Sequence, residues 1–250
     1  MKKLSTLLLM ACATVMPVSA ELDTDALPFL QMSQTDLHDV YIKQSEAFIG
    51  AKSAAEAGKL LLDGENTPEF MKAYNRLHKV QTGKIIGKPV IFSFVDKQYA
   101  ILSMKLKGLA KGSIYLFWDS QDELPKVDWQ ATYAYCEMNW DPFFAKKPTE
   151  ETAARVFILK SDYYNFEFGD DSEWVCFKAL HPQLDRSLYA YVKKDSEDHK
   201  RIEELFKKKR RVDLNLGLRF LPGSKSSNQV EITKIIGDTW LNQKSLPQSK

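Results

Sequence analysis

The chain has 250 residues, of which 44% are hydrophobic, so it can build the core of one large domain or two small ones. It carries 35 Lys and Arg against 33 Asp and Glu, and the first twenty residues contain two lysines and no acid. The rest of the chain is therefore neutral, which excludes the overall positive field typical of nucleic-acid-binding proteins.

The first twenty residues have the pattern of a secretory signal peptide. Lys2 and Lys3 precede the apolar stretch 4–16, and small residues follow at Ser19 and Ala20. The stretch is shorter than the about 20 residues of a transmembrane helix, and no later segment approaches that length. We expect a bacterial-type exported protein, periplasmic or secreted, without a transmembrane helix. A lipoprotein signal ending at Cys12 is the alternative, which Met10 fits poorly.

Two helices are predicted in the first half of the chain. The first covers 35–57, where apolar residues recur at steps of three and four and Gly50 weakens the later part. The second covers 68–82: Thr67 is a capping residue and Pro68 suits the first helical position. Gly83 is a typical stop signal.

From about 89 to 140 the period changes to two, which is typical of strands. Two strands flank Asp96, a third covers 113–119, and the stretch 129–140 is predicted as a fourth. Two prolines and several charges in 141–151 indicate a domain boundary. The sequence thus predicts an N-terminal α+β region over 21–145, with helices and antiparallel strands.

The second half alternates strand patterns with turn signals. The helix pattern in it, 195–209, has Ile202, Leu205 and Phe206 on one side. It falls between the third and fourth of five predicted strands. These strands are 154–168, 174–180, 187–194, 211–220 and 229–241.

This order resembles the OB-fold, a five-stranded, partly open β-barrel that binds oligonucleotides and oligosaccharides. The resemblance covers residues 152–241 and rests on the order of elements, because no signature motif accompanies it. It implies an α+β protein whose C-terminal half is an OB-like barrel with one helix between strands three and four. Other small β-barrels and other α+β folds stay open, and residues 242–250 are expected to be a flexible tail.

The resemblance also implies a ligand-binding face on the second and third strands and the flanking loops. Aromatic rings there could stack on bases or pack on sugars. The alternative is that these aromatics are ordinary half-buried strand residues. The candidate residues are Trp174, Lys178, Tyr189, Tyr191, Tyr164, Phe166 and Phe168, with Lys225 in the last loop.

A run of five cations stands directly before the fourth predicted strand. Positive charge at a helix C-terminus complements the helix dipole, and acidic residues precede the run. The run is therefore interpreted mainly as a helix end, with nucleic-acid or anionic-glycan contact as the alternative. Its members are Lys207, Lys208, Lys209, Arg210 and Arg211.

After the signal, Cys136 and Cys176 are the two cysteines left. In an oxidising compartment such a pair can form a disulfide, and the alternative is that each is a small buried hydrophobic residue. Their spacing does not match a metal motif.

The sequence lacks the short motifs of zinc, nucleophile-elbow, phosphate-loop and calcium-loop sites. Asp170, Asp171 and Glu173 form the densest acidic cluster, which fits a solvated turn better than a calcium or acid/base site. The four histidines, scattered over the chain, are interpreted as surface or packing residues, and neither metal nor cofactor is expected. They are His38, His78, His181 and His199.

These observations favour a non-catalytic secreted or cell-envelope protein that works through a protein partner or in an assembly. Exposed strands able to pair with a partner would serve that role. The alternative is a module for oligosaccharide or single-stranded nucleic acid, with nucleic acid the less favoured ligand. An unrecognised hydrolase is the third possibility.

Overall fold

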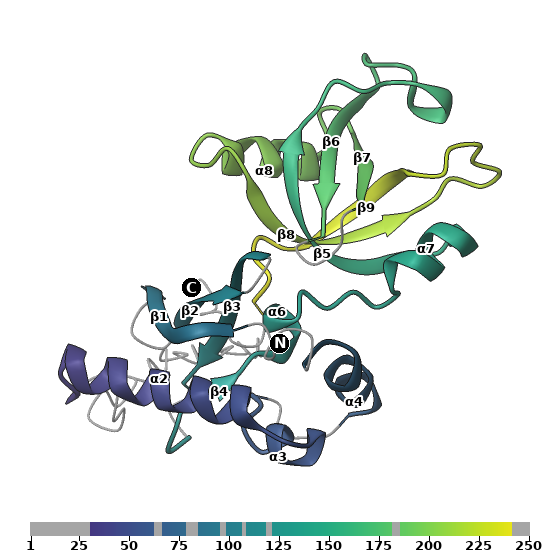
Figure 1. Cartoon of the computed structure of the whole chain (residues 1–250). Helices are drawn as coiled ribbons and strands as arrows, with labels where there is room; N and C mark the ends of the chain where they lie inside the picture. Colours follow the sequence, from purple (N-terminus) through teal and green to yellow (C-terminus); the bar gives the residue numbers. More distant parts are fainter. Residues whose placement is uncertain are drawn as a thin grey trace, which may run out of the picture.

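The computed structural model describes residues 31–62, 67–78, 85–95, 99–106, 109–118, 122–181 and 186–241. The predicted signal peptide with Cys12 and the predicted tail 242–250 lie outside these residues. The protein is α+β: its N-terminal half contains a four-stranded sheet and its C-terminal half a five-stranded one (Figure 1). Among the described helices, none has the length and apolar character that crossing a membrane requires.

The first predicted helix is two helices. Helix α2 runs over Gln34–Gly50 and α3 over Ala54–Gly58. Between them Ala51 takes an extended ψ of 127°, and the Ser53 side chain accepts a hydrogen bond from a backbone N–H of α3. The chain therefore starts a new helix there instead of continuing past Gly50.

The second predicted helix begins where expected and then changes geometry. Helix α4 covers Pro68–Ala73, and the Thr67 hydroxyl accepts a hydrogen bond from the N–H of Phe70 at 3.1 Å. The wider π-helix η2, Tyr74–His78, follows. The rest of the predicted helix lies outside the described residues.

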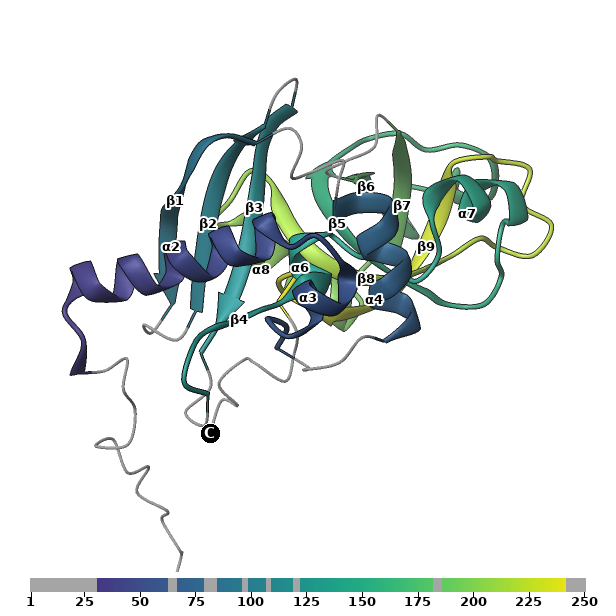
Figure 2. The same ribbon diagram turned by 60° about the horizontal axis from the view of Figure 1, so that its bottom comes forward.

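The first sheet contains β1 (Ile85–Val95), β2 (Tyr99–Leu106), β3 (Leu109–Phe117) and β4 (Lys126–Val127). These strands are antiparallel neighbours in chain order. Helix α2 lies across one face of the sheet, and β1 forms the edge away from the second sheet (Figure 2).

The predicted fourth strand at 129–140 is wrong. Helix α6 covers Trp129–Thr132, because the Asp128 carboxylate accepts the N–H of Ala131 at 3.0 Å and starts a helical turn. Helix α7 follows over Trp140–Lys146, in the stretch that was predicted to be a boundary. The aromatic residues that imitate a strand pattern here are buried in short helices and turns.

The second sheet closes on itself into a five-stranded barrel. Its strands are β5 (Thr152–Lys160), β6 (Trp174–Leu180), β7 (Ser187–Lys193), β8 (Val212–Arg219) and β9 (Gln229–Gly237). Around the barrel the order is β5–β6–β7–β9–β8, and β7 with β9 is the one parallel pair among the described strands of the barrel.

Two further points complete the barrel. Helix α8, Glu197–Phe206, connects β7 to β8, and the Ser196 hydroxyl accepts the N–H of His199 at its start. The first predicted strand is too long, because β5 ends at Lys160. The chain then runs outside the barrel through a short 3₁₀ turn, Phe166–Phe168, before β6 begins.

Each half has its own apolar core. In the N-terminal half, buried side chains of α2, α4 and α6 pack on the sheet around Tyr41, Phe48 and Phe70. In the C-terminal half the barrel interior is filled by small and aliphatic residues around Phe177. Helix α7 closes one side of this core, with the Phe143 and Phe220 ring centroids 5.3 Å apart.

A buried arginine joins the two halves. Arg155 on β5 is 5% exposed and donates through Nε to the carbonyl of Trp240 at 2.8 Å. Its Nη1 donates to the carbonyl of Tyr135 at 3.2 Å and its Nη2 to Oε1 of Gln130 at 2.8 Å. One side chain therefore fastens β5, the connection between the halves and the segment after β9.

An apolar layer surrounds this contact. The Trp240 ring lies 4.4 Å from Phe157 on the barrel and 6.3 Å from Tyr115 on the first sheet. Its indole N–H donates to the carbonyl of Val156 at 3.1 Å. The end of the described chain is thus packed between barrel and sheet.

The disulfide that the sequence left possible does not form in this structure. Cys136 and Cys176 are free and buried, Cys136 beside the barrel core and Cys176 under the loop that follows β5. Burial raises the pKa of both thiols, so each behaves as the small hydrophobic residue that was the alternative.

Replacing Arg155 by Met should weaken the contact between the two halves. The change leaves two buried carbonyls and an amide oxygen without their donor, which should lower the free energy of unfolding by about 3 kcal/mol. Urea unfolding of the wild type and the variant measures this loss. Arg186→Met is the control, because Arg186 forms an exposed pair with Asp141 and its loss should cost less than about 1 kcal/mol. Equal costs for the two changes would contradict the role given to Arg155.

The contact between the two halves, which we call the junction, should also make stability depend on pH. Burial lowers the pKa of His181 from 6.5 to about 4, and its ring Nε2 donates to the carbonyl of Ala134 at 3.1 Å. Between these two pKa values the histidine is protonated in the unfolded chain and neutral in the folded protein. The free energy of unfolding therefore falls as the pH falls through this range.

The change for His181 should reach about 1–3 kcal/mol between pH 7 and pH 4. Unfolding of wild type and His181→Gln across this range measures it, because the carboxylates contribute equally to both proteins. The variant should lose less stability on acidification, and two parallel pH profiles would contradict the assignment.

Candidate functional site

The candidate site is the outer surface of β6 and β7. Inward side chains of these strands, such as Phe177 and Ala190, belong to the barrel core. The residues between them point outward, and strand pairing places them opposite one another. We call this surface the outward face; it consists of Trp174, Cys176 and Lys178 on β6 and Tyr189, Tyr191 and Lys193 on β7.

The chain itself covers most of the outward face. Residues 161–173, which we call the strap, leave β5 and cross it before β6 begins. The Phe168 ring stacks on Tyr191 with 4.1 Å between centroids and 4° between planes, and it meets Trp174 edge-on at 4.9 Å. Phe168, Tyr191 and Trp174 are therefore buried, although none of them belongs to the barrel core.

A second ring contact lies nearer to solvent. Tyr163 of the strap stacks on Tyr189 with 4.2 Å between centroids and 28° between planes, and Tyr163 is 39% exposed. The Tyr164 hydroxyl accepts the backbone N–H of Cys176 at 3.3 Å. Tyr163 and Tyr164 thus both contact the barrel, and Tyr163 keeps part of its ring in solvent.

Phe166 is the most exposed large hydrophobic residue of the described chain, at 61%. Its φ of 50° lies in the left-handed region, which costs a residue with a side chain about 1–2 kcal/mol. The surrounding contacts hold this conformation, and strain of this kind is concentrated at functional positions in proteins.

Polar groups hold the strap to the barrel from below. The Tyr191 hydroxyl donates to the carbonyl of Tyr163 at 2.6 Å. Gln229, fully buried at the start of β9, donates through Nε2 to that hydroxyl and to Oδ1 of Asn165, both at 2.6 Å. The Oε1 atom of Gln229 is buried and has no hydrogen-bond partner among the described residues.

The loop before β9 holds the strap from the side. The carboxylate of Glu167 accepts the backbone N–H of Lys225 at 2.8 Å and the Ser224 hydroxyl at 3.3 Å. The Lys225 N–H is the largest cause that lowers the pKa of Glu167 below its usual value. The bond favours the ionised carboxylate and fastens the two loops to each other.

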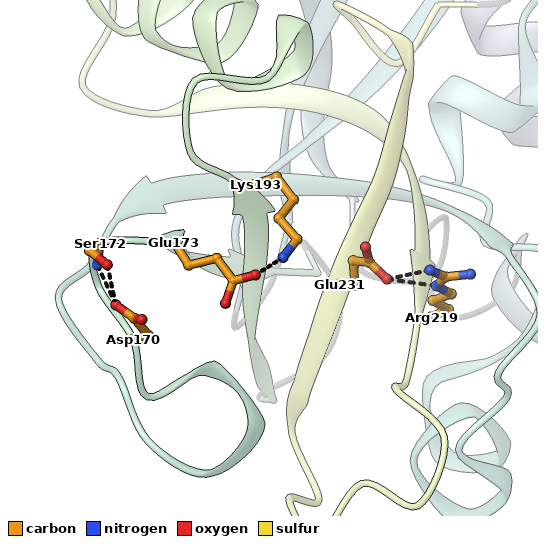
Figure 3. A network of polar contacts seen from close by, with 6 residues as sticks. All are labelled: Asp170, Ser172, Glu173, Lys193, Arg219 and Glu231. Atoms are coloured by element: carbon orange, nitrogen blue, oxygen red, sulfur yellow. Dashed lines mark hydrogen bonds and ion pairs between the residues drawn. The ribbon is translucent and has the colours of Figure 1, made fainter.

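The end of the strap carries the acidic cluster (Figure 3). Asp170 accepts the N–H and hydroxyl of Ser172 at 2.8 and 2.6 Å, which lowers its pKa, and Glu173 pairs with Lys193. The Lys193 ammonium also lies 4.0 Å from the centroid of the Trp174 ring. The carboxylates therefore form a turn and an ion pair, as the turn interpretation predicts.

The other side of Figure 3 shows an ion pair between Arg219 on β8 and Glu231 on β9, in which Nε and Nη2 of the guanidinium both donate to Oε2 at 2.7 Å. Glu231 is the neighbour of Tyr191 in the pairing of β7 and β9. The pair lies on β8 and β9 beside the outward face, and the two charges neutralise each other.

The structure brings the sequence-predicted residues together in unequal roles. Trp174 and Tyr191 are buried under the strap, Lys178 and Tyr189 are half-buried, and Phe166 is exposed. Lys225 contributes its backbone N–H to the Glu167 contact. Three further residues of this surface were not predicted from the sequence, and their one signal is their place in or next to the two loops beside the predicted face. They are Tyr163, Glu167 and Gln229.

The run of cations follows the end of α8. Lys207 forms an ion pair with Glu204, Lys209 lies 3.8 Å from Asp213, and the Arg211 guanidinium lies 4.2 Å from the Phe157 ring centroid. Three of the five cations thus have partners in the fold. The predicted helix 195–209 is too long, because α8 ends at Phe206 and none of the five cations lies in its last turn.

The described residues include no group of three or more His, Cys, Asp or Glu side chains that could hold a metal ion. Of the histidines, His199 accepts the N–H of Asp195 at 3.0 Å at the start of α8, and His181 lies in the junction. What the outward face offers chemically is ring stacking, hydrogen bonding and charge pairing. No protein-family model, curated protein or solved structure matches the chain.

Alanine at all five positions from Lys207 to Arg211 should change the free energy of unfolding by about 1 kcal/mol or less, because exposed pairs at a helix end contribute little. Thermal unfolding measures this. Anisotropy of a labelled single-stranded oligonucleotide at low and moderate salt measures binding, which should not differ between the two proteins. A large, salt-dependent loss of oligonucleotide binding in the variant would instead make the run a polyanion site.

Proposed function

We propose that this chain is a non-catalytic exported protein that binds a protein partner of the cell envelope or the extracellular medium. The binding surface is the part of the strap that faces solvent, together with the edge of the outward face beneath it. We call Tyr163, Phe166 and Tyr189 the aromatic patch. Aromatic residues supply much of the binding energy in protein interfaces.

The single observation that carries this proposal is the exposure of Phe166. Its ring is 61% exposed in a left-handed backbone conformation, on top of a segment fixed by stacked rings and hydrogen bonds. Presenting an apolar ring in a strained conformation costs stability and contributes nothing to the core. A contact between Phe166 and a partner would compensate for this loss of stability.

The proposal includes an OB-like fold for residues 152–241. The order β5–β6–β7–β9–β8, the parallel pair β7–β9 and the position of α8 between β7 and β8 support it. In that superfamily the second and third strands form the ligand face, which here is β6 and β7. The fold alone does not determine the ligand.

A second candidate function is oligosaccharide binding at the same place. The stacked pair of Tyr163 and Tyr189, with Lys178 opposite Tyr189, favours it, because sugar rings pack on partly exposed aromatic faces. Nucleic acid is less favoured, since three cations of the basic run have partners in the fold. The third candidate, a hydrolase, has no arrangement of described residues in its favour.

A photo-crosslinking residue in place of Phe166 should give a discrete adduct with one protein when the chain is produced in its own cells. Leu124 is the matched control position, because it is 48% exposed but lies in the N-terminal half, and a probe there should give none. Gel electrophoresis and mass spectrometry of the adducts measure this.

With the probe placed at Tyr163, the further change Phe166→Ala should lower the adduct yield about tenfold, the effect expected for an interface anchor. Equal labelling from positions 166 and 124 would contradict the proposal. A saturable change of tryptophan fluorescence on adding oligosaccharide, without any protein adduct, would favour the second candidate.

A further inference from the structure

The strap occupies the outward face in the way a bound peptide would. A ring of the strap stacks on Tyr191, its backbone carbonyl at Tyr163 accepts a hydrogen bond, and its amide at Asn165 meets Gln229. Its carboxylate at Glu167 is held by the loop before β9. Ring, carbonyl, amide and carboxylate each have a matching group on the barrel, as in peptide recognition.

Charge follows the same pattern. The strap, 161–173, contains five acidic residues and no Lys or Arg. The barrel side presents Lys178 and Lys193 on the outward face, and the Lys194 ammonium donates to the carbonyl of Asp171. The covered surface therefore complements an acidic segment that carries aromatic rings.

The strap can leave this surface without opening the barrel. The cluster around Phe168 and Tyr191 is separate from the core that fills the barrel, and the strap contributes no strand to the closed sheet. Its contacts with the rest of the barrel domain are a few ring contacts, a set of hydrogen bonds and the ion pair of Glu173 with Lys193. Local segments held in this way open at a lower free energy than the whole domain.

The cover is also imperfect. Gln229 is fully buried, yet its Oε1 atom has no partner among the described residues, which is costly for an amide in the interior. Phe166 is held at a positive φ. A segment with a donor for Gln229 and a relaxed backbone would fit the same surface better than the strap does.

We propose that the strap is a built-in competitor for the outward face, and that the partner carries an acidic, aromatic peptide segment that replaces it. This inference rests on the proposed function, since it names the class of segment by which the protein partner binds. The aromatic patch makes the first contact, and the partner's ring then takes the place of Phe168 on Tyr191.

The affinity for such a segment is set by competition. The strap is joined to the barrel, so its effective concentration at the face is high, in the millimolar range for short links. A peptide added from outside therefore binds wild-type protein weakly. Removing the ring of Phe168 lowers the competition and leaves Tyr191, Trp174 and Gln229 in place.

The test uses a labelled synthetic peptide with the strap's own residues 162–171, DYYNFEFGDD, and fluorescence anisotropy. The Phe168→Ala variant of the full chain should bind it at least about tenfold more tightly than the wild type. A peptide with alanine in place of its second phenylalanine should bind neither protein. Leu124→Ala is the protein control: Leu124 is 48% exposed and lies in the N-terminal half, so this variant should bind the peptide as weakly as the wild type.

A second variant, Glu167→Gln, removes the charge at the Lys225 contact and keeps every strap ring. It should also strengthen peptide binding, and hydrogen exchange in the strap should become faster while exchange in β6 and β7 stays slow. Glu204→Gln on α8 is its control, because that carboxylate pairs with Lys207 far along the chain from the strap.

Unchanged peptide affinity in both Phe168→Ala and Glu167→Gln, with either variant folded by circular dichroism, would overturn the inference. So would preferential binding of an oligosaccharide by these variants. The two proposals can fail separately. A protein adduct at position 166 tests whether a partner binds, and it does not require the strap to move.

Discussion

The stack of Phe168 on Tyr191 is the contact on which the functional surface depends. It turns a strand face with three aromatic residues into a buried cluster and fixes the course of the strap. Burying a phenylalanine ring contributes about 2–3 kcal/mol, and a well-placed ring pair adds about 1 kcal/mol. Together with the hydrogen bonds and the ion pair of the strap, this contact keeps the segment on the barrel, and it is small enough for a competing ring to replace. Phe166 stays exposed on the same segment, although Phe168, two residues further along, is buried.

The contact between the two halves leaves the strap and the outward face accessible. Arg155 and Trp240 join the two halves at the side of the barrel formed by β5 and by the segment after β9. The strap lies elsewhere on the barrel, above β6 and β7 (Figure 1). The N-terminal sheet and its helices therefore act as a fixed body behind the barrel, and a partner can approach the strap without disturbing the junction.

Much of the barrel could be predicted from the sequence, because β8 alternates strictly and β6, β7 and β9 are strand-like runs that end at clear turn residues. The segment 129–140 was wrongly predicted as a strand because its aromatic residues alternate. The carboxylate of Asp128 caps the backbone there and starts a helical turn instead. The structure brings most of the predicted site residues together on and around β6 and β7. Their burial could not be predicted, because the sequence does not tell which way Phe168 turns after β5. Nor does it tell that Gln229 meets Asn165, and Lys225 meets Glu167, across more than fifty residues.

Native-state hydrogen exchange of the protein from residue 21 onward tests the central claim most directly, because it gives the free energy of opening segment by segment. The account predicts that amides of the strap are protected, but open at a free energy several kcal/mol below that of β6 and β7. Strap amides that exchange as slowly as those of the barrel strands would make the strap a fixed part of the core. Strap amides that exchange as fast as an unfolded peptide would show that Phe168 does not cover Tyr191, and either result would contradict the account.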